Sequence, residues 1–166
     1  MTMYGSTILR IVYSYVKDEQ IAEDLTQDIF VKAFKNLHTF KGEASMKTWL
    51  IRIATNHAKD YLRSWHYKTV IVKEFVGMGS NSTDRTPEQQ LLDKVEYSAL
   101  TQAIFGLPTK YREIIILFYY QDLTLKEISE ILSINVNTIK SRMTRGRTLL
   151  REKMSENSEE GSIREL

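Results

Sequence analysis

The residues best suited to binding a charged partner are concentrated near the end of the chain. The stretch from Ile134 to Met154 contains six Lys or Arg residues and one acid, Glu152. Lysine and arginine side chains bind phosphate groups. We therefore consider two interpretations of this stretch, a helix that lies against nucleic acid and a basic surface helix that closes a helical bundle.

Enzymatic chemistry has little support in the sequence. The three histidines, His38, His57 and His66, form no metal-binding pair of the H-E-x-x-H kind, and no Ser or Cys nucleophile motif is present. The chain has no cysteine, which excludes disulfides and Cys-based zinc sites. We therefore expect a protein that is not an enzyme and uses no metal, cofactor or small-molecule substrate.

The composition indicates a helical protein that works in the cytoplasm. The chain has 166 residues, of which 42% are hydrophobic, with only seven Gly and two Pro. No signal peptide is apparent, and the longest apolar run, Ile114 to Tyr120, is too short to span a bilayer. The positive charge is segregated, because residues 107–154 hold nine basic and five acidic residues. This uneven charge favours a polyanionic partner.

The organisation along the chain predicts an all-α protein with two small helical domains joined by a flexible linker. The first helical block runs from about Thr7 to Tyr67, and the second from about Pro87 to Met154. The segment GMGSNSTDRTPEQQ between them reads as a linker, with Thr86 and Pro87 starting the next helix. We therefore predict domains at 1–67 and 87–154, a linker at 68–86, and an acidic, frayed tail at 155–166.

The second domain is predicted to end in a helix-turn-helix. Thr124 and Glu127 form a capping box for a short helix that ends at Leu132. The SINVN segment turns, Asn135 caps the next helix, and the small Ser129 lies where the two helices cross. Core positions follow a helical spacing in both helices: Ile128, Ile131, Leu132, Ile139, Met143, Gly146 and Leu150.

The opposite face of the last helix is polar and basic. In a helix-turn-helix, the N-terminal part of the second helix enters the major groove. The residues best placed to contact base edges are Asn137, Thr138, Lys140, Ser141 and Arg145. The same polar side also holds Arg142, Thr144, Arg147, Thr148 and Arg151. Among these, the three arginines are candidates for phosphate contacts.

A second basic stripe lies on a predicted helix from Ser45 to Trp65. Arg52, Asn56, Lys59 and Arg63 recur at spacings of four, three and four residues beside a broad apolar side. Cations beside aromatic rings suit single-stranded nucleic acid, because bases stack on rings while cations follow the backbone. Trp49 can either pack in the core or stack on a base. We expect four other residues of the apolar side to pack in the core: Leu50, Ile53, Tyr61 and Trp65.

Two segments precede this helix. The loop from Thr39 to Ser45 includes Phe40, Lys41 and Gly42 and can form a pocket for an extruded base. A helix from about Ile21 to Leu37 has a narrow polar stripe that suits either a partner surface bearing Arg or an ordinary exposed helix face. The stripe consists of Asp24, Gln27, Asp28 and Lys35, with Val31 among them.

Two long segments carry a family resemblance. AEDLTQDIFVKAFKNLHTFKGEASMKTWLIRIATNHAKDYLR, residues 22–63, resembles region two of bacterial sigma factors of the extracytoplasmic-function class. LPTKYREIIILFYYQDLTLKEISEILSINVNTIKSRMTRGRTLLREKM, residues 107–154, resembles their region four. The two segments occur in the family's order and are separated by a linker of suitable length.

The resemblance implies three sets of contacts. Docking on core RNA polymerase is implied for Asp24, Gln27, Asp28, Phe30 and Val31. Melting and capture of the minus-ten element are implied for the Phe40–Ser45 loop and for the predicted helix from Ser45 to Trp65 with its basic stripe. The residues concerned are Phe40, Lys41, Gly42, Trp49, Arg52, Asn56, Lys59 and Arg63. Reading of the minus-thirty-five element is implied for Asn137, Thr138, Lys140, Ser141, Arg142, Thr144, Arg145 and Arg147.

The implied partners are core RNA polymerase, promoter DNA and an anti-sigma factor, which in many family members is soluble or linked to the membrane. The alternative is a free-standing helix-turn-helix regulator that binds duplex DNA without polymerase. Such regulators usually dimerise, and no dimerisation heptads are evident in the sequence.

Two departures from the family pattern accompany the resemblance. Lys140 stands where members often have Arg, which predicts softer base discrimination because Lys lacks Arg's two-pronged geometry. Only about twenty residues precede Ala22. We therefore expect a shortened first helix with weakened packing at Ile8, Leu9, Val12 and Val16.

Overall fold

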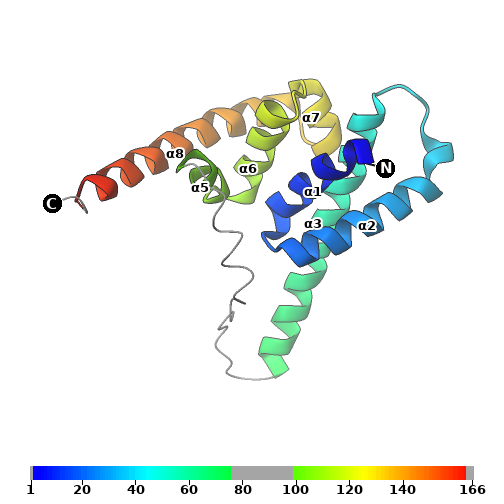
Figure 1. Cartoon of the computed structure of the whole chain (residues 1–166), viewed down its shortest axis with the longest axis horizontal. Helices are drawn as coiled ribbons and strands as arrows, with labels where there is room; N and C mark the ends of the chain where they lie inside the picture. Colours follow the sequence, from blue (N-terminus) through cyan, green and yellow to red (C-terminus); the bar gives the residue numbers. More distant parts are fainter. Residues whose placement is uncertain (1, 76–98, 164–166) are drawn as a thin grey trace.

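The computed structural model describes the backbone of residues 2–75 and 99–163, and the side chains of residues 3–65 and 99–155 (Figure 1). These residues form helices and connecting loops, without a strand in the described ranges. The predicted all-α class is therefore confirmed.

The first block consists of α1 (Thr2–Val16), α2 (Glu19–Lys35), a short 3-10 turn η1 (Leu37–Thr39) and the long α3 (Met46–Phe75). Asp18 caps α2 by accepting a hydrogen bond from the backbone N–H of Ile21 at 2.9 Å. The three helices pack on one another. Their shared core contains Ile8, Ile11, Val12, Ala22, Leu25, Ile29, Leu50, Ile51, Ala54 and Ala58.

The expected weak packing of the first helix is wrong. Ile8 and Val12 are fully buried, and Leu9 and Val16 are partly buried against the same core. Helix α1 contacts both α2 and α3. Its apolar residues recur at helical spacing, so they reach both neighbouring helices.

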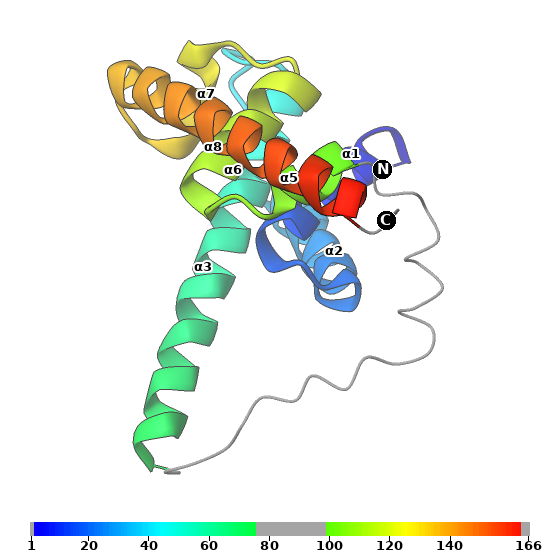
Figure 2. The ribbon, with the colours of Figure 1, turned by 90° about the vertical axis from the view of Figure 1, so that its left-hand side faces the viewer.

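Helix α3 is longer than predicted. It continues ten residues past Trp65 to Phe75, so the first part of the predicted 68–86 linker is helical. The sequence has no Gly or Pro between Ser45 and Gly77 to end the helix. In Figure 2 the C-terminal half of α3 extends away from the other helices. The remainder of the linker and the predicted helix start at Pro87 lie outside the described residues.

The second block consists of α5 (Ala99–Phe105), α6 (Thr109–Ile115), a π-helical turn η2 (Ile116–Tyr120), α7 (Leu125–Leu132) and α8 (Val136–Ile163). Its buried residues include Ile104, Leu107, Ile114, Leu117, Ile128, Ile131, Ile139 and Met143. Helix α8 continues without a break through Ser155 to Ile163, so the first part of the predicted tail is helical. No Pro interrupts this stretch, and its glutamates favour helix.

A buried arginine holds the start of the second block together. Arg112 is 3% exposed and donates hydrogen bonds to the carbonyls of Phe105 and Leu107 at 3.0 and 2.9 Å. Burial lowers the pKa of this guanidinium from its ordinary value, while Tyr15 and Glu113 act in the opposite direction. Arg112 thereby satisfies the last carbonyl of α5, at Phe105, and the carbonyl of Leu107 in the segment that follows.

The predicted helix-turn-helix is confirmed in detail. Thr124 accepts a hydrogen bond from the Glu127 backbone N–H, and the Glu127 carboxylate accepts one from the Thr124 backbone N–H. Asn135 accepts a bond from the Asn137 backbone N–H at 2.8 Å and so caps α8. Ser129 also stabilises the turn, because its hydroxyl donates to the Ile134 carbonyl. Ser133, in the left-handed region at a φ of 55°, ends α7.

The two blocks are in direct contact. Helix α7 packs on α3, and α6 packs on α1. In Figure 1 the yellow α7 lies beside the N-terminal half of α3. This contact was not predicted from the sequence, which indicated only two domains on a tether.

Candidate nucleic-acid interface

The N-terminal half of α8 presents the predicted base-reading face to solvent. Its buried side is formed by Ile139, Met143 and Gly146. The predicted contact residues divide by exposure. Asn137, Lys140, Ser141, Thr144, Arg145 and Arg147 are exposed, while Thr138 and Arg142 are partly buried. The structure therefore brings this set together on one helix, with six of its eight members accessible.

The hydroxyl groups and the cations on this face differ in their hydrogen bonds. Ser141 donates to the Asn137 carbonyl at 2.9 Å, and Thr144 donates to the Lys140 carbonyl at 3.1 Å. These hydroxyls retain acceptor lone pairs toward solvent. Within the described part of the chain, no hydrogen bond or ion pair engages the side chain of Lys140 or of Arg145. The side chains of these two exposed cations are therefore available to donate to a ligand.

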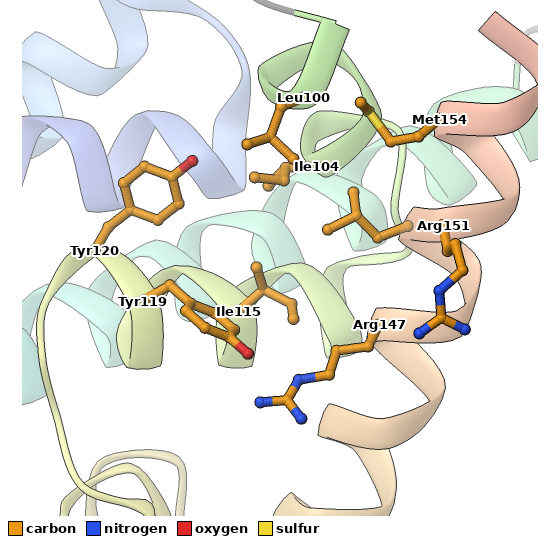
Figure 3. Close-up of a pocket in the computed structure, with 9 residues that line it drawn as sticks. Leu100, Ile104, Ile115, Tyr119, Tyr120, Arg147, Arg151 and Met154 are labelled. Carbon is orange, nitrogen blue, oxygen red and sulfur yellow. The ribbon is translucent and has the colours of Figure 1, made fainter. Parts of the chain in front are cut away.

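Arg147 lies on the flank of this face, beside an apolar groove (Figure 3). Its guanidinium lies over the Tyr119 ring, 5.5 Å from the ring centroid. The groove has a volume of about 510 Å³ between α5, η2 and α8. It is lined by Leu100, Ile104, Ile115, Tyr119, Tyr120, Arg147, Leu150, Arg151 and Met154. The sequence offered one sign of this groove, the apolar run through Tyr120, which was interpreted only as too short for a membrane span.

The predicted polymerase-binding residues lie along α2. Asp24, Gln27, Asp28 and Val31 are exposed, and Phe30 is partly buried. Phe34, one turn beyond Phe30, is 80% exposed and was not among the predicted contacts. An acidic stripe therefore adjoins an exposed apolar residue, which suits a protein partner.

The predicted base-capture loop brings two aromatic rings together. The rings of Phe40 and Trp49 lie 5.5 Å apart between centroids, at an angle of 55°. Lys41 is exposed, and Gly42 has a φ of 75°, a conformation that side-chain-bearing residues rarely adopt. Ser45 caps α3 by accepting a hydrogen bond from the Thr48 N–H at 3.0 Å. The loop thus anchors its aromatic pair directly at the start of α3.

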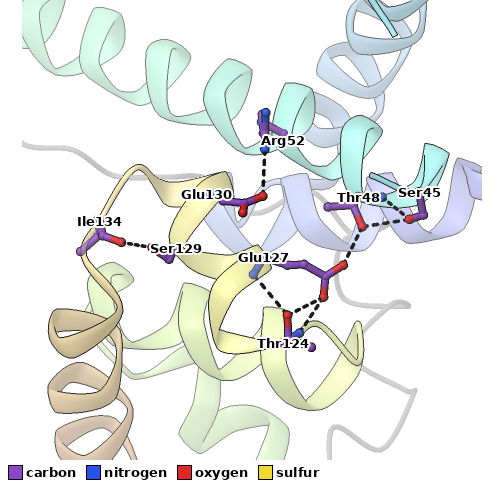
Figure 4. Close-up of polar contacts among 8 residues, drawn as sticks. All are labelled: Ser45, Thr48, Arg52, Thr124, Glu127, Ser129, Glu130 and Ile134. Carbon is purple, nitrogen blue, oxygen red and sulfur yellow. Dashed lines mark hydrogen bonds and ion pairs between the residues drawn. The ribbon is translucent and has the colours of Figure 1, made fainter. Parts of the chain in front are cut away.

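The basic stripe of α3 is divided between solvent and the second block. Asn56 and Arg63 are exposed, and Arg63 pairs with Asp60 on its own helix at 3.2 Å. Arg52 instead pairs with Glu130 of α7 at 3.7 Å (Figure 4). Lys59 pairs with Glu113 of α6 at 2.8 Å. Trp65 is 51% exposed, so the prediction that it packs in the core is wrong.

Glu113 lies within a buried polar cluster where α1, α3 and α6 meet. Its side chain is 4% exposed and accepts a hydrogen bond from the Tyr15 hydroxyl at 2.8 Å. Burial, and then the charge of Glu113, raise the pKa of Tyr15 well above its ordinary value. Tyr15 is therefore a neutral hydrogen-bond donor. No pattern in the sequence indicated that Glu113 or Glu130 would contact the first block.

Comparison with known proteins identifies the class. The model for Sigma-70 region 2 matches residues 1–66, and the model for Sigma-70 region 4 matches residues 97–150. The ECF RNA polymerase sigma factor SigW of Bacillus subtilis (strain 168) is 34% identical over 92% of this chain and 85% of its own length. SigM of the same organism is 32% identical over 90% of this chain and 89% of its own length. The chain belongs to the sigma-70 family.

Within that family it is a sigma factor of the ECF class, as the resemblance predicted. The fold agrees with that of solved structures. RpoE in complex with the anti-sigma factor NepR from Bartonella quintana matches with a TM-score of 0.72 and 24% identity, over 93% of each chain. CnrH in complex with the cytosolic domain of CnrY matches with a TM-score of 0.65 and 22% identity, over 93% of this chain and 84% of CnrH.

Proposed function

We propose that this sigma factor directs bacterial core RNA polymerase to promoters through three surfaces on one chain. The α8 face reads the minus-thirty-five element with the residues set out above. The Phe40–Ser45 loop and the α3 stripe capture and melt the minus-ten element. The acidic stripe of α2, with Phe30 and Val31, docks on the polymerase.

The observation that carries this proposal is the exposed, unpaired state of Lys140 and Arg145 on a helix held by a complete helix-turn-helix. Contacts to base edges in the major groove are made by hydrogen-bond donors such as Arg and Lys. A donor side chain that has no partner in the free protein loses no interaction when it binds a base. Phosphate contacts from neighbouring arginines would fix the register of the helix. The same chain also carries the Phe40–Trp49 pair and the cations of α3, which suit a separated strand.

Opening the duplex requires no covalent chemistry from this chain. Unstacking a base costs a few kcal/mol. Stacking of the base on aromatic side chains and contacts within a pocket can offset this cost. We therefore infer that the protein is not catalytic and acts only through binding. In the described residues no group of His, Asp and Glu side chains is arranged to hold a metal ion.

We also propose a cytoplasmic place of action and regulation by an anti-sigma factor. RpoE, which shares the fold, was solved in complex with the anti-sigma factor NepR. Among the described helices, none combines the length and apolar character needed to cross a membrane.

A selection with and without polymerase tests the proposal against the free-standing regulator. A random duplex library would be exposed to the full chain alone, to core polymerase alone, and to both together. We expect enrichment of a bipartite sequence only when both are present. Tight, specific retention by the chain alone, unchanged by polymerase, would support the free-standing regulator and contradict the sigma proposal.

A further inference from the structure

The side chain of Arg147 is held by an aromatic ring and not by an acid. Its guanidinium carbon lies over the Tyr119 ring, 5.5 Å from the ring centroid, and Figure 3 shows the two side chains at the edge of the groove. Within the described ranges, no carboxylate pairs with Arg147 and no hydrogen bond engages its side chain. A ring attracts the cation without accepting a directed hydrogen bond, so the N–H donors of the guanidinium remain available.

Tyr119 is itself fixed in place, although it is 48% exposed. It belongs to η2, the π-helical turn that continues α6, and such turns are frequent at functional sites. Leu117 anchors the turn in the core, and the Leu117 carbonyl accepts a hydrogen bond from the Leu123 backbone N–H at 3.2 Å. The Phe118 ring packs against the core and meets the Tyr119 ring edge-on, 5.0 Å away between centroids. Tyr119 therefore offers Arg147 a fixed surface.

The close approach of α8 to α6 brings Arg147 over this ring. Gly146 immediately precedes Arg147, and a Cβ at Gly146 would lie 3.4 Å from the Tyr111 Cβ and 3.6 Å from the Ile115 Cγ1. The two helices therefore pack closely at Gly146. Since η2 directly follows α6, Tyr119 lies about one helical turn beyond Ile115. The position of the Arg147 guanidinium thus follows from packing within the second block alone.

Arg147 continues a polar row that begins in the base-reading part of α8. Lys140, Thr144 and Arg147 are exposed and are spaced four and three residues apart, so they share one side of the helix. The N-terminal part of such a helix enters the major groove. Arg147 lies about 10 Å farther along the axis than Lys140, which favours contact with the phosphate backbone over base edges. A guanidinium binds a phosphate through two parallel N–H bonds.

We propose that Tyr119 is a positioning residue for DNA binding, because its ring holds the Arg147 guanidinium ready for a phosphate at the minus-thirty-five element. This inference rests on the proposed function, since it assigns α8 to that element. Ordering a long side chain on binding typically weakens affinity by about two- to tenfold. Contact with the Tyr119 ring in the free protein removes part of that loss. In this role the Tyr119 hydroxyl makes no contact with DNA.

A double-mutant cycle on promoter binding tests this role. The full chain bound to core polymerase would be titrated against a fluorescein-labelled duplex selected by the two together, and anisotropy would give the Kd. The chains compared are wild type, Tyr119→Leu, Arg147→Ala and the double variant. We expect Tyr119→Leu to weaken binding by about threefold in the wild-type background. It should have no further effect in the Arg147→Ala background, because coupled residues are not additive.

Two further variants separate the ring from its surroundings. Tyr119→Phe keeps the ring without the hydroxyl and should bind like the wild-type chain. Tyr120→Leu is the matched control, since it removes the neighbouring exposed ring of the same turn and should also leave the affinity unchanged. Circular dichroism would check that each variant is folded.

The salt dependence of binding gives an independent readout. Loss of one phosphate contact in Arg147→Ala should reduce the slope of log K against log salt by about 1. Tyr119→Leu retains that contact, so its slope should equal that of the wild-type chain. A slope reduced equally in both variants would mean that Tyr119 contributes a DNA contact of its own and would contradict the positioning role.

Additive losses in the double variant would overturn the inference, as would an Arg147→Ala affinity equal to that of wild type. Losses in Tyr119→Phe or Tyr120→Leu as large as in Tyr119→Leu would overturn it too. Coupling to Arg147 together with full affinity in Tyr119→Phe would support it. If that result were obtained while the wild-type chain left the start sites of polymerase unchanged, the proposed function would fail and the positioning role would stand.

Discussion

The ammonium group of Lys59 lies 2.8 Å from the carboxylate of Glu113, and this ion pair joins α3 of the first block to α6 of the second. Lys59 belongs to the stripe proposed to bind the melted strand. The pair therefore connects the arrangement of the two blocks with the availability of a DNA-binding cation.

Arg145→Ala should weaken binding to duplex DNA containing the upstream element by about 1–3 kcal/mol, the range for a good base contact. Arg145 is exposed on α8 and has no partner among the described residues that its loss would disturb. Fluorescence anisotropy of the holoenzyme on promoter fragments measures the loss. Arg10→Ala removes an exposed cation from α1 and serves as the control. Equal losses in both variants would show a general charge effect instead.

Asn56→Ala should impair promoter opening and leave upstream binding intact. Asn56 is exposed on the part of the α3 stripe that the second block does not cover. Permanganate footprinting on duplex and pre-melted templates separates the two steps, and Ser64→Ala provides an exposed control on the same helix. Pre-melting should restore most of the activity. No rescue at all would remove Asn56 from the opening step.

Thr124→Ala should lower the free energy of unfolding by about 1 kcal/mol, the usual cost of losing an N-cap side chain. Its hydroxyl accepts the Glu127 N–H at 3.2 Å at the start of the helix-turn-helix. Thr124→Ser retains the hydroxyl and should stay close to wild type. Urea denaturation followed by circular dichroism compares the three chains, and equal losses in both variants would contradict the capping role.

The same capping box predicts a pH dependence. The backbone N–H of Thr124, then its hydroxyl, hold the pKa of Glu127 below its ordinary value of 4.5. A carboxyl with a lowered folded-state pKa contributes stability above its unfolded pKa and loses it as pH falls through the folded value. The stability advantage of wild type over Glu127→Gln should therefore shrink on acidification. An advantage that stays constant from neutral to acidic pH would rule out this source.

Gly146→Ala should raise the free energy of unfolding by up to about 1 kcal/mol, because alanine favours the helix interior more than glycine does. A Cβ at this position would lie 3.4 Å from the Tyr111 Cβ and 3.6 Å from the Ile115 Cγ1, in ordinary contact. Gly146→Leu, which adds a larger side chain toward α6, should destabilise the fold. Thermal denaturation of both variants gives the comparison, and destabilisation by alanine would mean that the contact is tighter than these distances indicate.

Local features of the fold were predictable because their signals are local in sequence. The capping box at Thr124, the Asn135 cap and the apolar spacing of Ile139 and Met143 each involve residues within one or two helical turns. Helix ends were less accurate. The end of α3 at Phe75 was missed, since nothing in the sequence stops the helix at Trp65.

The contact between the blocks was not predictable from those signals. Glu113 is adjacent in sequence to Arg112 and looks like any charged residue of an amphipathic helix. Its pairing with Lys59 and Tyr15 depends on how two separate helical blocks pack, which no periodicity encodes. A DNA-reading face could be predicted for α8 because its residues share one helix. The sequence could not show that Arg52 and Lys59 of the α3 stripe pair with the second block.

Run-off transcription tests the central claim most directly. A bacterial core RNA polymerase would be mixed with the full chain and with promoter fragments selected by the two together, and the 5′ ends of the transcripts would be mapped. We predict new, discrete start sites downstream of the bipartite sequence that are lost without the chain. Unchanged start sites, despite tight binding of the chain to the same fragments, would contradict its role as an initiation factor.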